Sequence, residues 1–588
     1  MAFFHKSYER GYIKEGYLHP NLLLFMGYIT AAQNRKPTRH MKKIALLSLL
    51  FSLSFSHLFA QQTIGLFTNT IEAFDGYTLF GPRNSTETYL INNCGEKVHS
   101  WSSQYKPGGS IYLLENGILL RTARTGTGPG GNGLVEMIDW NSTLIWSHSV
   151  DSTHGRQHHD VKLLPNGNIL ILARDVRTQA EVIQAGGLTA QASIKSEQIV
   201  EIQPDLVNGG ATVVWEWKAW DHLIQGADST KDDYGVVSNH PHRIDINFLD
   251  HNSSDWLHMN SVDYNEEFDQ IILSARDFSE FWIIDHSTTL AESADSVGGT
   301  FGQGGDILYR WGNPQSYSQG TSSDQKLFLQ HHTHWIPENL LDAGKILMFN
   351  NRAGTPQTQS YSTVNTVDLP VDTNGFYTYN GGAFGPTNFD WTYQAPNPTN
   401  FFSAVFSGAQ RLPNGNTLIC EGVPGKFFEV DTNQNIVWEY INPVNNLGPQ
   451  AQDSSIIDNQ AFRSTRYAPN YPGLSGKSLV AQGYIETGST FSCTLYAVGL
   501  IESQFSENAF ELFPNPSDGV ITLKIPHEQR ENLDLKIHNT TGQIVYEMRI
   551  TTQDPFLTID LNHLGRGVYY ASILNEKGGW NQKIILTK

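Results

Sequence analysis

The chain repeats one pair of short motifs six times. The first motif is an apolar strand ending in aromatic residues, with copies at 98–101, 144–148, 213–217, 307–311, 389–393 and 436–440. The second is a strand–turn–strand segment after each copy, at 112–120, 162–172, 262–276, 335–349, 411–419 and 471–480. Each unit supplies about four short strands, and a four-stranded unit repeated radially is a β-propeller blade. The pattern predicts an all-β fold with a six-bladed β-propeller over residues 62–500.

Composition narrows the function classes. The 588 residues carry a formal net charge of −19, which argues against a nucleic-acid partner because phosphates need a basic face. The three cysteines, Cys94, Cys420 and Cys493, lack the spacing of a metal site and allow at most one disulfide.

The start of the chain predicts export. Residues 41–60 combine Met41-Lys42-Lys43 with a Leu/Phe-rich run that ends at Ala60, which is typical of a signal peptide. We expect translation to begin at Met41, with residues 1–40 a mis-assigned upstream extension; a cytoplasmic extension is the alternative. The apolar run is short for a membrane span, and no later stretch is apolar enough, so no transmembrane segment is expected after signal removal.

The last part of the chain, residues 506–588, alternates polar and apolar residues and predicts a separate small β-sandwich. It carries PNPSDG at 514–519, NTTGQIV at 539–545 and LGRGVYY at 564–570. These motifs resemble the type A sorting domain of the type IX secretion system of Bacteroidetes. The resemblance implies that the type IX machinery is a partner and that the protein passes through the periplasm to the surface or the medium.

Three histidines stand at the same place in three units. His159, His258 and His331 each lie six residues before the start of a turn. Equivalent positions of successive blades face one another around the channel of a propeller, so these side chains are predicted to converge at one end of it. Arg276 follows the hairpin of His258, and Asn260 lies on the same side of its strand as His258.

This set of residues admits several interpretations. Each histidine could satisfy only a local hydrogen bond, or three imidazoles could hold zinc in a metal-dependent hydrolase. Arg276 disfavours the metal, because a fixed cation beside a divalent ion is unfavourable, whereas its forked donors suit an oxyanion. Transfer of an anionic group through a histidine nucleophile, without a cofactor or metal, fits the set better. A non-enzymatic propeller that binds glycans or proteins at the cell surface is the other alternative.

The chain resembles the bacterial aryl-sulfate sulfotransferases that do not use the nucleotide sulfate donor PAPS. The matching segments lie at 158–168, 215–225, 255–265, 271–277, 330–337, 410–422 and 437–443. The resemblance implies a six-bladed propeller and a ping-pong transfer through a sulfohistidine, from an aryl sulfate donor to a phenolic acceptor.

The resemblance also implies residue roles. The histidine of the Gln-His motif, here His331, is the nucleophile; His258 and Arg276 bind the sulfuryl group, and His159 is the remaining active-site histidine. Asn260 matches the asparagine of the family. The neighbouring His158 and His332 are further substrate-binding candidates.

The sequence departs from the family pattern in two places. Relatives often have an acidic residue after the nucleophile, whereas this chain has His332, which leaves it as an alternative nucleophile; the repeat favours His331. The stretch from Gln61 to about Phe80 is also too short for the N-terminal β-domain of the periplasmic members. Elsewhere, His222, His240 and His242 lie in the long third-unit insertion; they could reach the site, but surface positions are favoured.

Overall fold

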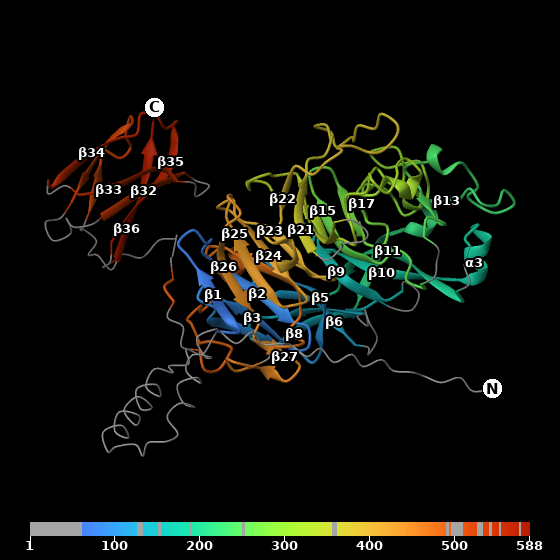
Figure 1. Ribbon diagram of the computed structural model, residues 1–588, viewed down its shortest axis with the longest axis horizontal. Helices are drawn as coiled ribbons and strands as arrows, with labels where there is room; N and C mark the ends of the chain where they lie inside the picture. The colour runs from blue at the N-terminus through green and yellow to red at the C-terminus, as the bar shows by residue number, and fades with distance from the viewer. Residues whose placement is uncertain are drawn as a thin grey trace, which may run out of the picture. The chain divides into compact units, whose positions relative to one another are not determined.

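A computed structural model describes most of the chain (Figure 1). It covers residues 62–125, 133–150, 155–188, 191–249, 253–354, 361–454, 456–489, 493–495, 510–525, 533–539, 544–551, 554–575 and 578–587. The predicted signal peptide and the upstream extension lie outside these residues.

Between residues 62 and 495 the described chain forms six large antiparallel sheets, as the repeated motifs lead one to expect. Three of them, in spatial order, are β29 (Ala461–Tyr467), β2 (Tyr77–Pro82), β3 (Glu87–Ile91), β4 (Lys97–Ser102); β5 (Lys106–Leu113), β6 (Leu119–Arg124), β7 (Leu134–Ile138), β8 (Leu144–Ser149); and β9 (Gln157–Leu163), β10 (Ile169–Thr178), β11 (Ser193–Pro204), β12 (Ala211–Lys218). The others are β15 (Met259–Asn265), β16 (Gln270–Ala275), β17 (Glu280–Asp285), β18 (Tyr309–Trp311); β19 (His331–Trp335), β20 (Ile346–Ala353), β21 (Tyr361–Val367), β22 (Trp391–Tyr393); and β23 (Gly408–Arg411), β24 (Thr417–Glu421), β25 (Lys426–Val430), β26 (Ile436–Ile441), with β1 (Gly65–Asn69) added at the edge.

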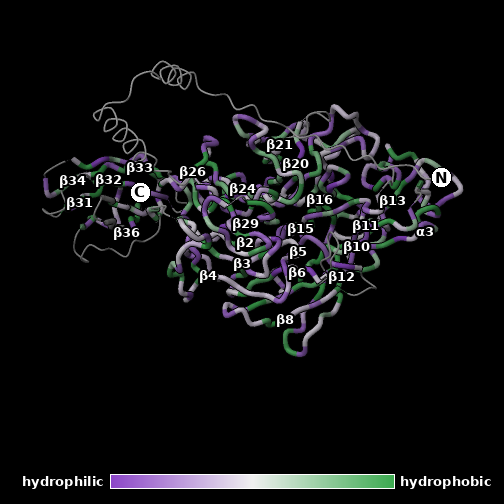
Figure 2. Tube along the Cα trace, turned by 60° about the horizontal axis from the view of Figure 1, so that its bottom comes forward, coloured by the Kyte–Doolittle hydropathy of each residue, from purple (hydrophilic) through white to green (hydrophobic). Residues whose placement is uncertain are grey.

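One edge strand of each sheet lies against that of the next. β5 lies against β9, β9 against β15, β15 against β19, β19 against β23, β23 against β29, and β29 against β5. The six inner strands therefore neighbour one another in a cycle. The core lies between sheets and is built from strands such as β16 and β17, whose residues are all buried. Apolar residues recur along most of these strands (Figure 2).

Five of the six predicted hairpins are confirmed: β5–β6, β9–β10, β15–β16, β19–β20 and β23–β24. The sixth prediction, a hairpin at 471–480, is wrong. That segment contains the 3-10 helix η7 (Pro472–Leu474) and no strand. In the sheet β29-β2-β3-β4, the inner strand is β29, and its partner β2 comes from the other end of the domain. A disulfide between Cys94 and Cys493 joins the same two regions.

Short elements occupy the connections between the large sheets. They are α3 (Gln179–Gln184), η2 (Ala219–His222), β13 (Leu223–Ile224), η3 (Val237–Asn239), β14 (Ile244–Asp245), η4 (Glu292–Ala294), η5 (Pro314–Tyr317), η6 (Pro398–Asn400), β27 (Val444–Asn445) and β28 (Gly448–Pro449). The surface prediction is wrong for His222, which is buried with Nδ1 2.8 Å from Asp306 and Nε2 2.9 Å from the Ser293 carbonyl.

The C-terminal region forms two further antiparallel sheets. They are β30 (Glu511–Phe513), β31 (Val520–Lys524), β34 (Phe556–Asp560); and β33 (Ile544–Ile550), β32 (Leu533–Asn539), β35 (Gly567–Asn575), β36 (Gly578–Leu586). Their inward-facing residues, among them Leu523, Leu535 and Ile573, share one hydrophobic core, which is the arrangement expected of a β-sandwich. Among the residues described, no helix has the length and apolar character needed to cross a bilayer.

Candidate functional site

The predicted histidines lie where the inner strands β9, β15 and β19 begin. Each of these strands carries an irregularity near its start, because its ladder with the following strand shifts there. His159, His258 and His332 have positive φ values of 54°, 48° and 54°. Bulges and such backbone conformations re-aim side chains and cluster at functional sites.

The structure brings the three predicted histidines together, but not in one register. In β19, His331 pairs with Phe349 of the neighbouring strand. The equivalent position in β15 is Met259, which pairs with Ala275. His258 precedes that place, and His159 lies inside the irregularity of β9. The three histidines lie the same number of residues before a turn but not at equivalent positions in the sheets, because the turns and bulges differ in length.

The tautomer of His331 is fixed by Asn351 of β20. The Asn351 amide nitrogen donates to the carbonyls of Ser403 at 2.8 Å and Phe406 at 3.0 Å. Its oxygen is therefore left to accept a hydrogen bond from Nδ1 of His331, at 2.7 Å. Nε2 of His331 then carries the lone pair, and the Phe406 N–H approaches it at 3.3 Å. That contact is long for a hydrogen bond, so the lone pair is weakly engaged.

The surroundings of His331 favour the neutral ring. The side chain is buried at the start of β19. Burial, followed by the positive charge of Arg276, holds its pKa well below the ordinary histidine value. A neutral imidazole with a free lone pair is a competent nucleophile at neutral pH.

His332, the alternative nucleophile, has different contacts. Its ring stacks on that of His334 at 4.2 Å between centroids, and its Nδ1 is buried with no hydrogen-bond partner in the described part of the chain. A Cβ on Gly408 would lie 2.4 Å from this nitrogen, so the ring fills the space beside a glycine.

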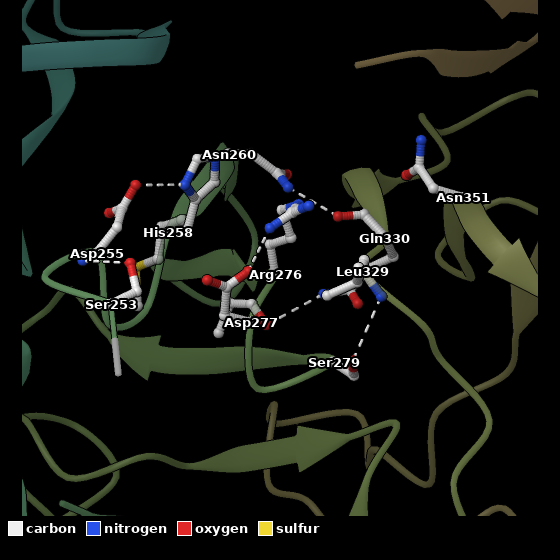
Figure 3. Close-up of polar contacts among 12 residues, drawn as sticks. Ser253, Asp255, His258, Asn260, Arg276, Asp277, Ser279, Leu329, Gln330 and Asn351 are labelled. Atoms are coloured by element: carbon white, nitrogen blue, oxygen red, sulfur yellow. Dashed lines mark hydrogen bonds and ion pairs between the residues drawn. The ribbon is translucent and has the colours of Figure 1, made fainter. Parts of the chain in front are cut away.

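His258 is held by a carboxylate. Its Nδ1 lies 2.8 Å from Oδ2 of Asp255, which is also paired with Arg174 (Figure 3). Burial would raise the pKa of Asp255, but the hydrogen bond with His258 and the Arg174 charge together hold it below its ordinary value. An ionised Asp255 keeps the proton of His258 on Nδ1 and directs Nε2 away from the carboxylate.

His159 ends a buried hydrogen-bonded chain. Nδ1 of His159 lies 2.7 Å from Nδ1 of His158, and Nε2 of His158 lies 2.6 Å from Oε2 of Glu197 on β11. The ring of His159 also lies 4.9 Å from that of His258. Burial raises the pKa of Glu197 to about 8, so this carboxyl can hold a proton near neutral pH. The chain can therefore carry a proton between Glu197 and Nε2 of His159.

Asn260 and Arg276 lie beside the start of β19 (Figure 3). Nδ2 of Asn260 donates to the Gln330 carbonyl at 2.7 Å, while its Oδ1 is buried and has no partner among the described residues. Arg276 donates from Nη1 to the neighbouring Asp277, and its buried Nε has no described partner. Arg276 thus has donor capacity left for an anion.

Several site residues were missed from the sequence. Glu197, Asp255 and Asn351 orient the histidines, and Arg463 on β29 donates to Asp160 at 2.8 Å and to the Asn260 carbonyl at 3.0 Å. Of these residues, Asp255 could have been found from the sequence, because it lies three residues before His258. Among the described residues, no three or more His, Cys, Asp or Glu side chains are grouped to hold a metal ion.

The fold and the site define a class: an all-β protein of repeated antiparallel sheets with a buried histidine–arginine cluster where the inner strands begin. The sequence model of the arylsulfotransferase (ASST) family matches residues 100–461. The chain belongs to this family, and membership supports arylsulfotransferase activity in general.

The tail belongs to a second family. The secretion system C-terminal sorting domain matches residues 511–587. The protein is therefore a type IX secretion substrate that is secreted or reaches the cell surface.

Other similarities are distant. No curated protein matches the chain. A protein of unknown function from Bacteroides caccae is 12% identical, with 67% of this chain and 98% of that chain covered and a TM-score of 0.37. A catalytically inactive virginiamycin B lyase from Staphylococcus aureus, solved with quinupristin, is 9% identical, with 66% and 91% covered and a TM-score of 0.30.

Proposed function

We propose that the main domain is a six-bladed β-propeller and a PAPS-independent aryl-sulfate sulfotransferase. It moves a sulfuryl group from an aryl sulfate to a phenol in two steps through a sulfohistidine at His331. The cycle of six inner strands supports the propeller, and family membership supports the reaction class. The observation that carries the mechanism is the hydrogen bond from Nδ1 of His331 to Asn351, which places the lone pair on Nε2, where it has the long contact with the Phe406 N–H.

In the first step the Nε2 lone pair of His331 forms a bond to sulfur, and the bond from sulfur to the aryl oxygen breaks. Arg276 donates to the sulfuryl oxygens, and the imidazolium form of His258 donates to them from Nε2 while Nδ1 stays on Asp255. Negative charge builds on the leaving oxygen as the bond to sulfur breaks. Asn260 helps through the remaining amide hydrogen that Gln330 does not use. These fixed donors hold the sulfuryl group in position for attack along the line of the breaking bond.

The leaving phenolate takes a proton from His159. The Glu197–His158–His159 chain replaces that proton, because each member can pass one on along its hydrogen bond. In the second step an acceptor phenol gives its proton to His159, and its oxygen attacks sulfur. The nitrogen–sulfur bond then breaks, and its electron pair returns to Nε2 of His331.

The test uses the metal-stripped propeller with p-nitrophenyl sulfate, with and without phenol. Phenol-dependent nitrophenol release that His331→Ala abolishes is the expected result. Near-normal turnover by His331→Ala would refute the assignment of the nucleophile. Release that needs added zinc would favour a metal-dependent hydrolase, and no release under any condition would favour a surface-binding propeller.

A further inference from the structure

A second cationic feature lies near His331, where the inner strands begin. The dipeptide Ala-Arg recurs on the second strand of three sheets: Ala123-Arg124 ends β6, Ala173-Arg174 lies within β10, and Ala275-Arg276 spans the end of β16. In each case the alanine pairs with the start of the inner strand. These three arginines therefore occupy equivalent places at the same end of their sheets.

Two of the three arginines are neutralised. Arg174 is paired with Asp255, and Arg276 with Asp277. Arg124 instead donates from Nη2 to the Arg83 carbonyl at 2.9 Å. No carboxylate within the described ranges forms an ion pair with either Arg83 or Arg124.

Arg83 and Arg124 form a pair of neighbouring cations. Arg83 follows β2, and its backbone N–H donates to the Gln460 carbonyl at 2.7 Å, just before the inner strand β29. Burial, followed by repulsion from Arg124, lowers the pKa of Arg83 to about 10. Two like charges placed together and partly desolvated, in a chain of net charge −19, cost free energy that a bound anion would offset.

Arg83 is connected to the nucleophile through one residue. Its guanidinium carbon lies 4.3 Å from the centroid of the Phe406 ring, and the N–H of Phe406 approaches Nε2 of His331 at 3.3 Å. The Phe406 ring lies 6.0 Å from that of Phe462, which lies 5.8 Å from the ring of His159. The Phe462 ring thus lies beside His159, the Phe406 ring lies beside the Phe462 ring, and Arg83 lies over the Phe406 ring.

We propose that Arg83 and Arg124 form a subsite for a second anionic group on the aromatic substrate. This inference rests on the proposed function. An aryl ring whose sulfate faces His331 lies along Phe406 and Phe462, and an acidic substituent across the ring reaches the two guanidinium groups. The preferred substrates are aryl sulfates and phenols that also carry a carboxylate or a second sulfate ester. Donor and acceptor share the subsite, because in a two-step transfer each occupies the same place in turn.

The experiment compares two donors of equal shape, 4-carboxyphenyl sulfate and its uncharged 4-carboxamide analogue, with phenol as the acceptor. The readout is the ratio of their kcat/KM values in the full-length protein and in the variants Arg83→Gln and Arg124→Gln. Comparing ratios between proteins cancels the intrinsic difference between the leaving groups. We expect the ratio to fall roughly tenfold or more in each variant, the size expected when a charge-assisted hydrogen bond is lost.

The matched control is Arg177→Gln, which removes a surface arginine that pairs with Asp175. In Arg177→Gln the ratio of kcat/KM values should equal that of the unaltered protein. An equal fall in this control would show that the ratio follows the net charge of the protein, which would overturn the subsite. An unchanged ratio in both Arg83→Gln and Arg124→Gln would also overturn the subsite. If one of these variants does not fold, the ratio in the other tests the subsite by itself.

Binding separates this inference from the proposed function. Calorimetry with 4-hydroxybenzoate and 4-hydroxybenzamide needs no turnover. Tighter binding of the benzoate, lost in the two variants, would support the subsite even if neither donor transferred a sulfuryl group. Transfer from both donors with equal binding of the two phenols would retain the proposed function and refute the subsite.

Discussion

At the scale of single residues, the orientation of the histidines depends on residues that the sequence did not single out. His331 receives its tautomer from Asn351, and Asn351 is fixed because both its amide hydrogens are used elsewhere. His258 is oriented by Asp255, and His159 is linked through His158 to Glu197. These partners come from other strands or loops, so only their neighbours in space reveal them.

Removing the partner of His331 should slow the chemistry. In Asn351→Ala the imidazole loses the hydrogen bond that keeps the lone pair on Nε2. We expect kcat to fall roughly 10- to 100-fold, since an unsatisfied buried group costs about 1–3 kcal/mol. KM should change little, which steady-state kinetics with p-nitrophenyl sulfate would measure.

Asn365→Ala is the control for that variant. Asn365 is also buried, on β21, and donates to Thr392 at 2.8 Å. Its loss should lower stability without lowering kcat. Equal kcat values in the two variants would show that Asn351 only supports the fold.

The Glu197–His158–His159 chain predicts a pH and leaving-group effect. Glu197→Gln keeps the shape but cannot relay a proton, so donors with poorly acidic phenols should lose more rate than p-nitrophenyl sulfate. The inflection near the Glu197 pKa of about 8 should also disappear from the pH–rate profile. Glu201→Gln, on the same strand and in contact with His286 at 3.0 Å, is the control. Matching profiles for both variants would contradict the relay.

The same carboxyl links stability to pH. Its folded pKa of about 8 lies above the ordinary value of 4.5, so the folded protein retains a proton that the unfolded chain releases. This contribution to stability is fully present below pH 4.5 and is lost as the pH rises toward about 8.

At the scale of elements, five hairpins followed from the sequence because each pairs neighbours along the chain. The sixth did not, since β29 and β2 belong to opposite ends of the domain and no local pattern joins them. The register of the histidines failed for a related reason: bulges add residues on one strand only, which counting cannot reveal.

The Cys94–Cys493 disulfide also joins segments far apart in the sequence, because its partners are 399 residues apart. Cys94→Ser should lower the free energy of unfolding by about 2–5 kcal/mol, because the unfolded chain gains freedom. Chemical denaturation would measure the loss, and kcat should be retained because neither cysteine contacts the site residues. Cys420→Ser, which removes a buried unpaired thiol, is the control. A Cys94→Ser protein as stable as the unaltered one would contradict this role.

At the scale of the whole molecule, two families share the chain: an arylsulfotransferase over 100–461 and a sorting domain over 511–587. The sequence predicted both, because their motifs are local. It also singled out the histidines, the arginine and the asparagine of the candidate site, which stand in the motifs. The carboxylates and the arginine pair were missed because only folding gathers them.

The most direct measurement is to trap the intermediate. The protein is incubated with p-nitrophenyl sulfate and no acceptor, quenched in alkali, digested and fragmented by mass spectrometry. We expect one sulfuryl group on His331, absent in His331→Ala and removed when phenol is added before the quench. A sulfuryl group on His332 instead, or nitrophenol released with no modified histidine, would contradict it.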